Sequence, residues 1–216
     1  MVVLLASWLV AVPLVVAGTF RSEPKLARAE SPVSRAAALP ACTIFGSAAS
    51  ETLVGTASDD VICALGGDDV VRGRGGDDVL FGSTGDDSLE GGSGKDRLFG
   101  HFGVDRLRGG PGRDFLQGGG GPDVLSGGLG SDIADYGERI SPVRVSIGRG
   151  ANDGAQGESD NVRRNVERVR GGHAADTLIG NARRNRLIGK GGDDALKGKR
   201  GDDRLRAGAG ADRLDG

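Results

Sequence analysis

Aliphatic residues recur at every ninth position along most of this chain, and glycine-rich polar stretches separate them. From Gly55 the sequence divides without insertion into nine blocks of nine residues that end at Asp135. One apolar residue with a neighbour on each side suits a strand of three residues, about 10 Å long. The other six residues of each block must turn, which glycine allows. The aliphatic eighth positions of the blocks are Ile62, Val71, Leu80, Leu89, Leu98, Leu107, Leu116, Leu125 and Ala134.

The same period returns outside these nine blocks. A degenerate block covers residues 46–54, and five further blocks cover 171–215 after a break. Residues 162–170 form a worn block with Glu167 and Val169 in the matching places. The eighth positions of the later blocks are Leu178, Leu187, Leu196, Leu205 and Leu214.

The period predicts an all-β solenoid. Two blocks make one coil of strand, turn, strand and turn, and successive coils stack as parallel strands about 4.8 Å apart. A single repeat cannot bury its aliphatic side chain alone, so the core forms only when coils stack. A buried leucine contributes roughly 1.5–3 kcal/mol, so a complete stack is stable although each strand is short.

The sixth position of the blocks carries the candidate chemistry. It is aspartate in all nine blocks of the first array and in four of the five blocks of the second. The candidate metal ligands are therefore Asp60, Asp69, Asp78, Asp87, Asp96, Asp105, Asp114, Asp123, Asp132, Asp176, Asp194, Asp203 and Asp212. Asn185 stands at the remaining position.

Stacking brings these acids close together, because residues 18 apart fall on the same edge of the solenoid. Two carboxylates about 5 Å apart repel by roughly 3 kcal/mol at an effective dielectric constant near 20. A Ca²⁺ ion between them reverses the sign, since calcium takes six to eight oxygen ligands in flexible geometry; Mg²⁺ suits such a site less well. No Cys/His cluster suits zinc. The alternative is a metal-free solenoid in which Asp–Gly turns only cap strands, but an invariant aspartate favours metal. In the second array the best pairs are Asp176/Asp194 and Asp194/Asp212.

The blocks resemble G-G-x-G-x-D-x-U-x, the nonapeptide of RTX (haemolysin-type) calcium-binding repeat proteins of secreted bacterial type. The resemblance covers residues 42–135 and 171–216. It implies a right-handed parallel β-roll in which aspartate carboxylates and carbonyls of the glycine-rich turns hold Ca²⁺ between turns. The chain departs from the motif at the second glycine of several blocks, which affects individual sites and not the fold. The substitutions there are Thr56, Leu65, Arg74, Ser83 and His101.

The chain divides into five parts on this basis. Residues 1–18 are apolar and predict a signal peptide, although no Lys or Arg precedes the apolar run. An uncleaved anchor is the alternative. Residues 19–41 read as a flexible leader, 42–135 as the first calcium-binding array, 136–170 as an insert, and 171–216 as the second array. We expect a secreted or cell-surface protein with no stable membrane span after cleavage.

The insert has its own pattern. Alternation over residues 139–147, which include Ile140, predicts a longer strand. Residues 148–161 read as a polar loop. Its acids, Asp153, Glu158 and Asp160, either hold another ion or lie in solvent, and we favour the solvated loop.

Cys42 and Cys63 are the only cysteines. An even pair in a secreted chain predicts a disulfide, here across the first coil. Two unpaired cysteines are the alternative.

Composition and charge narrow the function. The 41 glycines lack the three-residue period of collagen, and with 27 % charged residues the chain is no multi-span membrane protein. Two histidines and no H-E-x-x-H or G-x-S-x-G motif argue against an enzyme. We expect a non-catalytic structural or interaction protein that binds calcium.

The acidic first array is followed by a basic second half, with 17 Lys and Arg against 12 Asp and Glu in residues 136–216. This excess either solubilises one face, which we favour, or contacts anionic cell-envelope polymers or glycans. Aromatic residues do not alternate with the charge, so no nucleic-acid partner is expected. The alternative functions are a Ca²⁺-dependent adhesin or envelope-binding module and, less favoured, an accessory part or fragment of a secreted hydrolase.

Overall fold

The computed structural model describes residues 41–216. The predicted signal peptide and all of the predicted leader except Ala41 lie outside the described residues. Within residues 41–216 there is no helix that is long and apolar enough to cross a membrane.

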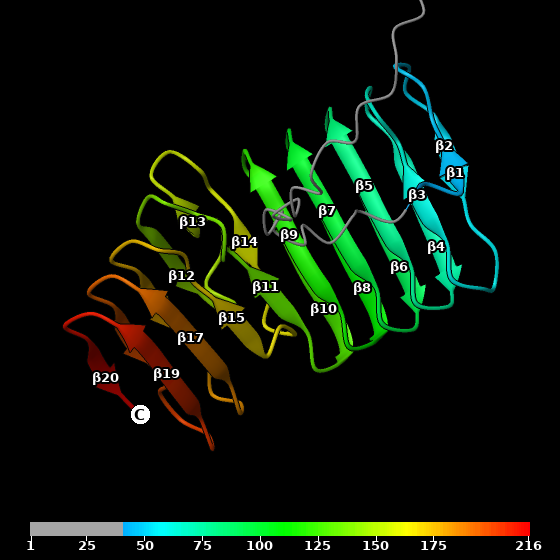
Figure 1. Ribbon diagram of the computed structural model, residues 1–216. Helices are drawn as coiled ribbons and strands as arrows, with labels where there is room; N and C mark the ends of the chain where they lie inside the picture. Colours follow the sequence, from blue (N-terminus) through cyan, green and yellow to red (C-terminus); the bar gives the residue numbers. More distant parts are fainter. Residues whose placement is uncertain (1–40) are drawn as a thin grey trace, which may run out of the picture. The chain divides into compact units, whose positions relative to one another are not determined.

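Residues 41–216 contain strands and turns and no helix (Figure 1). Most strands are three to seven residues long, because each begins beside the aliphatic residue of a block and many continue into the glycine-rich turn. The strands are β1 (Ile44–Phe45), β2 (Thr52–Val54), β3 (Val61–Cys63), β4 (Val70–Gly75), β5 (Val79–Thr84), β6 (Ser88–Ser93), β7 (Arg97–Phe102), β8 (Arg106–Gly112), β9 (Phe115–Gly120), β10 (Val124–Gly130), β11 (Ile133–Asp135), β12 (Val143–Ser146), β13 (Gly154–Ala155), β14 (Asn161–Val162), β15 (Arg168–Arg170), β16 (Thr177–Ile179), β17 (Arg186–Gly191), β18 (Ala195–Lys197), β19 (Arg204–Ala209) and β20 (Arg213–Asp215).

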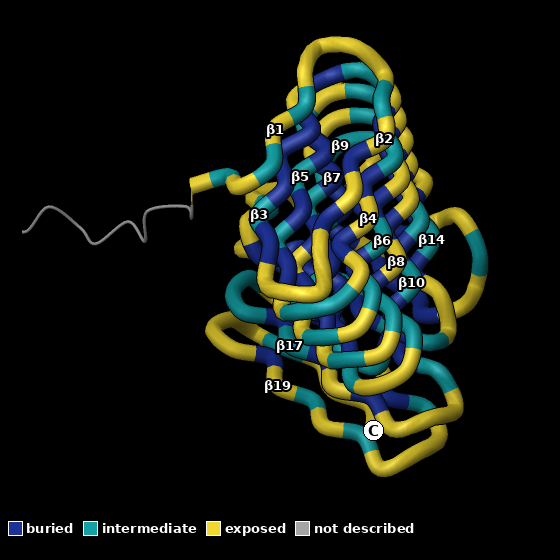
Figure 2. The backbone as a smooth tube through the Cα atoms, turned by 90° about the vertical axis from the view of Figure 1, so that its right-hand side faces the viewer, coloured by how far each residue is buried: buried dark blue, intermediate teal, exposed yellow. Residues whose placement is uncertain are grey.

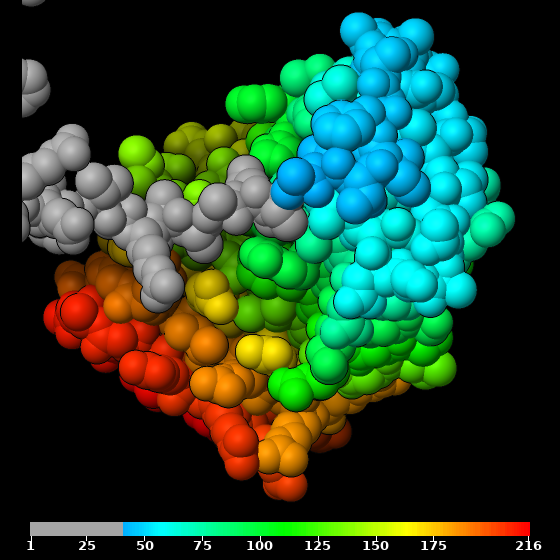
Figure 3. All heavy atoms as spheres, turned by 45° about the vertical axis from the view of Figure 1, so that its right-hand side comes forward, coloured from blue at the N-terminus to red at the C-terminus, as the bar shows by residue number. Residues whose placement is uncertain are grey.

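Alternate strands fall into opposite sheets. One nine-stranded sheet has the order β1-β3-β5-β7-β9-β11-β15-β17-β19, and it faces a six-stranded sheet, β14-β10-β8-β6-β4-β2, and a five-stranded sheet, β13-β12-β16-β18-β20. In the regular arrays neighbouring strands are parallel and 18 residues apart, as in Leu80 opposite Leu98 and Leu89 opposite Leu107. The parallel β-roll that the sequence predicts is confirmed, and the coils succeed one another along the surface in Figure 3.

The aliphatic eighth positions form the core. In the first array every one of them is at most 1 % exposed, from Ile62 to Ala134. In Figure 2 these buried positions run as dark columns inside the stacked coils, with exposed turns around them. In the last coil Leu205 is only partly buried and Leu214 is 50 % exposed, because β19 and β20 lie at the edges of their sheets. Each strand therefore contributes one side chain to a thin core that is continuous across coils.

The insert contributes more strands opposite the nine-stranded sheet than it contributes to that sheet. In the nine-stranded sheet β11 pairs directly with β15, so Ala134 lies opposite Val169. On the other side β14 extends the first sheet, with Val162 opposite Leu125, and β12 begins the next, with Val145 opposite Leu178. The chain thus forms β12, which pairs with the later strand β16, before it forms β14, which pairs with the earlier strand β10.

Two expectations for the insert are wrong. The strand predicted over 139–147 spans only Val143–Ser146, and Ile140 is 86 % exposed. The polar loop is not solvated throughout, because Asp153 and Asp160 are each 1 % exposed. Asp153 accepts hydrogen bonds from the backbone N–H groups of Ser146 (2.6 Å) and Val162 (2.9 Å), so it joins the two strand layers.

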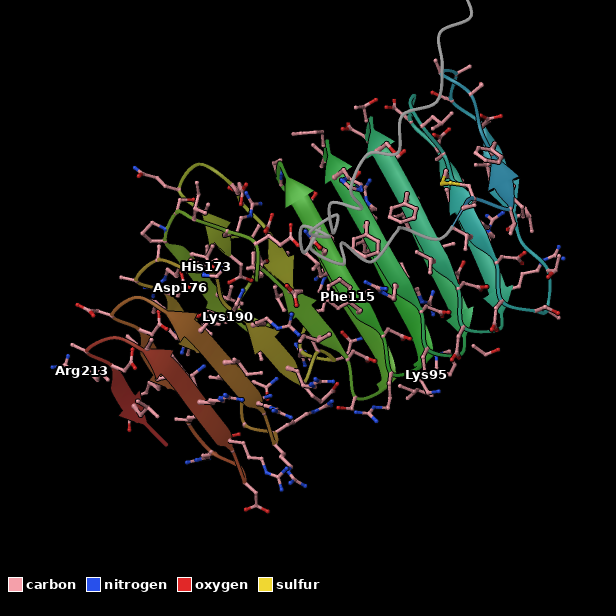
Figure 4. All side chains as sticks on the ribbon, in the orientation of Figure 1. Lys95, Phe115, His173, Asp176, Lys190 and Arg213 are labelled. Carbon is pink, nitrogen blue, oxygen red and sulfur yellow. A yellow bond between two sulfur atoms is a disulfide. The ribbon has the colours of Figure 1, made fainter. Side chains whose placement is uncertain are left out.

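The predicted disulfide is confirmed. Cys42 and Cys63 are bonded, with their Cα atoms 5.9 Å apart. The bond ties the residues before β1 to the end of β3 and appears as the yellow stick there in Figure 4. It therefore holds the first coil at the open edge of the nine-stranded sheet.

Candidate metal centre

The sixth-position aspartates form ladders along two edges of the roll. In the first array each carboxylate from Asp69 to Asp132 accepts, through Oδ1, the backbone N–H of the acid one coil earlier. The distance is 2.9 Å from the nitrogen of Asp78 to Asp96 and 3.0 Å from that of Asp96 to Asp114. One ladder contains Asp60, Asp78, Asp96, Asp114 and Asp132, and the other Asp69, Asp87, Asp105 and Asp123. The structure thus stacks the acids at the separation of 18 residues expected from the period.

The second oxygen of most of these carboxylates is buried and has no hydrogen-bond partner. The aspartates that carry such an Oδ2 atom are Asp69, Asp78, Asp87, Asp96, Asp105, Asp114, Asp123, Asp132, Asp194 and Asp203. A buried acceptor without a partner costs roughly 1–3 kcal/mol, and more when it is charged. A row of such atoms is therefore a set of unused ligand positions.

Backbone carbonyl oxygens lie close to these unused atoms. A Cβ atom built on Gly73 would lie 2.2 Å from Oδ2 of Asp78 and 2.5 Å from the carbonyl oxygen of Gly91 in the next coil. Glycine is needed here because any side chain would fill the space that the two oxygens share. Carboxylate and carbonyl oxygens are the ligands that calcium prefers.

Burial raises the pKa of these carboxyl groups. The pKa is raised to about 6 in Asp96 and in Asp105, and to about 7 in Asp114. In Asp123 it reaches about 8, because the charges of Asp160, Asp105 and Glu158 add to the effect of burial. The ladder thus resists ionisation unless a positive charge compensates it.

The donor set fits calcium better than a transition metal. Across residues 41–216 no three or more His, Cys, Asp or Glu side chains gather in a group that could hold a metal ion. An ion would therefore be held by the carboxylates of two stacked turns together with backbone carbonyls. Calcium accepts such all-oxygen, partly backbone sites, whereas zinc takes Cys and His nitrogen or sulfur ligands.

The family model described as RTX calcium-binding nonapeptide repeat (4 copies) matches more than half of the chain. The matched segments are residues 45–80, 72–107, 100–134, 170–198 and 188–216. The chain belongs to the RTX calcium-binding repeat family. Calcium is accordingly the ion of these repeats. No curated protein matches the chain.

The second RTX array repeats the ladder with fewer unused oxygens. The N–H of Asp176 donates to Asp194 (2.8 Å), and that of Asp194 to Asp212 (2.9 Å). The backbone N–H of Asn185 likewise donates to Oδ1 of Asp203 (2.7 Å). Oδ2 of Asp176 already has a partner, because it accepts the N–H of Gly172 at 2.6 Å.

Two acids of the insert continue the ladders of the first RTX array. Asp160 accepts the N–H of Asp123 (2.9 Å), and Glu167 accepts that of Asp132 (3.0 Å). Oδ2 of Asp160 accepts the Tyr136 hydroxyl (3.0 Å), so it has a hydrogen-bond partner that the Oδ2 atoms of the repeats lack. Sequence reasoning names Asp160 only as an acid of the polar loop and misses its place in the ladder, because it follows Asp123 by 37 residues instead of 18. The signal that could have found it is the aliphatic Val162 two positions later, the same spacing that marks every repeat.

Proposed function

We propose that this protein is a secreted, non-catalytic RTX β-roll that folds when it binds calcium outside the cell. The observation that carries the proposal is the row of buried Oδ2 atoms without partners, whose carboxyl groups have raised pKa values. The ligands are drawn from the thirteen sixth-position aspartates of the two arrays. Where calcium is scarce, ladder repulsion keeps the chain open and exportable. Millimolar calcium outside the cell matches the affinities of extracellular calcium modules.

The division of the chain supports the same proposal. Residues 1–18 direct export, 19–41 form a leader, and 136–170 join the calcium-binding arrays 42–135 and 171–216. The test of export is to express the full chain in a bacterial host and sequence the N-terminus of the protein in the medium. Cleavage near Ala17 supports secretion, and an intact N-terminus in the membrane fraction supports the anchor.

The positions of the two histidines favour a non-catalytic role. His101 packs against the rings of Phe81 and Phe99, with centroids 6.0 and 6.2 Å away. Burial lowers the pKa of His101, which reduces its positive charge near neutral pH. His173 lies 3.2 Å from the Lys190 amine. Within residues 41–216 neither ring is hydrogen-bonded to a hydroxyl or thiol group, so we expect no turnover of ester, peptide or glycoside substrates by the purified protein.

Calcium-dependent folding is tested by far-UV circular dichroism of the full chain. We expect a disordered spectrum in EDTA, a β spectrum in millimolar Ca²⁺, and little β structure at the same concentration of Mg²⁺, because Mg²⁺ demands stricter octahedral geometry. A β spectrum that chelation leaves unchanged contradicts the proposal.

One surface favours the adhesin as a second candidate function. Arg168, Arg186 and Arg204 lie opposite one another on β15, β17 and β19. Together with Arg113, Arg184 and a single acid, Glu167, they line a cavity of about 400 Å³. Within residues 41–216 none of these five guanidinium groups has a carboxylate within salt-bridge distance. Burial and the neighbouring arginines lower the pKa of Arg168. Such a cationic row suits an anionic cell-envelope polymer.

The adhesin is tested with dextran sulfate as the probe and neutral dextran as its control, both in calcium. We expect binding of the sulfated polymer only, weakened at least tenfold in the double variant Arg186→Gln/Arg204→Gln. The matched control is Arg213→Gln on β20, which lies outside the cavity. Equal losses in the double variant and the control, or no binding, would exclude this surface.

A further inference from the structure

The repeats contain two kinds of turn, which differ at the fourth position of the block. Apart from the worn block 162–170, in which Arg163 donates its N–H to Leu125 and not to Glu167, fifteen blocks have a turn with an acid or amide at the sixth position. Eleven of these fifteen have glycine at the fourth position. The other four turns carry Ala49, Ser58, Ala174 and Arg183 at that position.

In the four turns without this glycine, the turn's own backbone satisfies the sixth side chain. The N–H of the second residue donates to it, from Thr56 to Asp60 and from Gly172 to Asp176, both at 2.6 Å. The same bond joins Ser47 to Glu51, and Asn181 to Asn185 at 2.7 Å. We call these turns closed.

In the eleven turns with the glycine, the second residue has a positive φ. The values run from 77° at His101 to 127° at Gly128. No second-residue N–H in these turns reaches the sixth side chain, and ten of their eleven aspartates keep a buried Oδ2 without a partner. Asp212, in the last turn, is the remaining one. We call these turns open.

The fourth residue decides between the two forms, and the second residue does not. Leu65 and Arg74 adopt positive φ values of 79° and 85° in open turns, although side chains disfavour that region. Gly172 could adopt it freely, yet its turn is closed, and Ala174 stands at the fourth position. Ten of the eleven fourth-position glycines have positive φ, as at Gly85 (125°), where a Cβ would lie 2.2 Å from the carbonyl oxygen of Gly67. Among the fifteen blocks, every turn with a side chain at this position is closed.

We propose that calcium occupies only the places where two stacked turns are both open, and that closed turns bind no ion. A closed turn has spent its second carboxylate oxygen on a backbone N–H, so it has one ligand fewer to offer. The proposal rests on the calcium binding proposed above and refines it. It removes Asp60 and Asp176 from the predicted ligands, and also Asp203, whose turn stacks on the closed turn of Asn185.

The rule sets the number of ions. Pairs of open turns hold seven ions, compared with nine if every stacked pair of sixth-position aspartates within the two arrays bound one. The seven pairs are Asp69/Asp87, Asp78/Asp96, Asp87/Asp105, Asp96/Asp114, Asp105/Asp123, Asp114/Asp132 and Asp194/Asp212.

The second array allows a gain-of-binding test with one substitution. The turn of Asp176, labelled with His173 in Figure 4, has glycine at its second position already, so Ala174→Gly removes the only obstacle to opening. Ala175→Gly is the matched control, because it adds a glycine to the same turn but not at the fourth position. Ions are counted by native mass spectrometry of the full chain in calcium.

We expect seven ions in the wild-type chain and in Ala175→Gly, and eight in Ala174→Gly. Asp176→Asn should keep seven, whereas Asp194→Asn should keep six. An unchanged count in Ala174→Gly, or the loss of an ion in Asp176→Asn, overturns the rule while leaving calcium binding intact. A wild-type chain that binds no calcium overturns the proposed function itself. The added ion in Ala174→Gly cannot arise from misfolding, which keeps the test decisive if an Asn variant fails to fold.

Discussion

Replacing one acid in the middle of a ladder should change stability in opposite directions with and without calcium. Asp96 is the best position, because it is 1 % exposed and its Oδ2 atom has no partner. Asp96→Asn keeps the Oδ1 acceptor for the N–H of Asp78 and removes only the negative charge.

Without calcium the variant should be the more stable protein. Asp96 stacks between Asp78 and Asp114, one coil away on each side. At about 5 Å and an effective dielectric constant near 20, each neighbouring charge destabilises the folded chain by roughly 3 kcal/mol. The measurement belongs at pH 8, since burial raises the pKa of Asp96 to about 6 and that of Asp114 to about 7, which leaves both mostly ionised.

With calcium the order should reverse, because Asp96 belongs to two of the seven pairs. An ion present at about 100 times its dissociation constant stabilises the folded state by about 2.7 kcal/mol. Losing both ions therefore costs about 5 kcal/mol.

The assay is circular dichroism at pH 8. In EDTA the osmolyte TMAO is titrated until the chain folds, and in calcium urea is titrated until it unfolds. We expect Asp96→Asn to need less TMAO in EDTA and less urea in calcium than the wild type. The control Asp60→Asn should show no loss in calcium. A variant that is less stable under both conditions would refute the electrostatic reasoning.

Three further predictions concern the core, the pH response and the disulfide. Leu98→Ala should lower the free energy of unfolding by about 2–5 kcal/mol in calcium, measured by urea denaturation, because Leu98 is 0 % exposed; Leu129→Ala, at 74 % exposed, is the control, and equal effects would contradict the assigned core. Folded-state carboxyl pKa values raised to about 6–8 mean that the calcium-free roll binds more protons than the unfolded chain. The stability of the calcium-free roll should therefore be greatest at low pH and fall as pH rises through this range. In EDTA the β signal in circular dichroism should grow from pH 8 to pH 5. A β signal independent of pH would count against the raised carboxyl pKa values. Reduction of Cys42–Cys63, which are 21 residues apart, should lower stability by about 3 kcal/mol in thermal melts with and without dithiothreitol, and an unchanged melting temperature would mean that the first coil needs no covalent tie.

The repeats could be predicted because their information is local. One aliphatic residue in nine marks a strand, and the 18-residue coil then places Leu80 beside Leu98 and Asp78 beside Asp96. No comparable period exists in the insert, where Asp160 joins its ladder 37 residues after Asp123. Ile140 is likewise exposed because β12 begins only at Val143, and no repeat marks that start in the sequence.

Closed turns were not predicted for a different reason: the sequence shows which blocks lack the fourth-position glycine, but not what its loss does to the sixth side chain. Asp60 and Asp78 occupy the same position of the same motif, yet only Asp60 has its Oδ2 bonded by its own turn. The difference arises from the backbone conformation that Ser58 imposes two residues earlier. A motif read as a list of ligands does not contain this conformational information.

The most direct test of the account is a crystal structure of the protein grown in calcium, with anomalous scattering used to locate the ions. We predict calcium bonded to the Oδ2 atoms of stacked open turns, for example between Asp78 and Asp96, and no ion at the closed turn of Asp60. Well-ordered ladders with no ion between their aspartates would contradict the claim that calcium makes the buried acids tolerable.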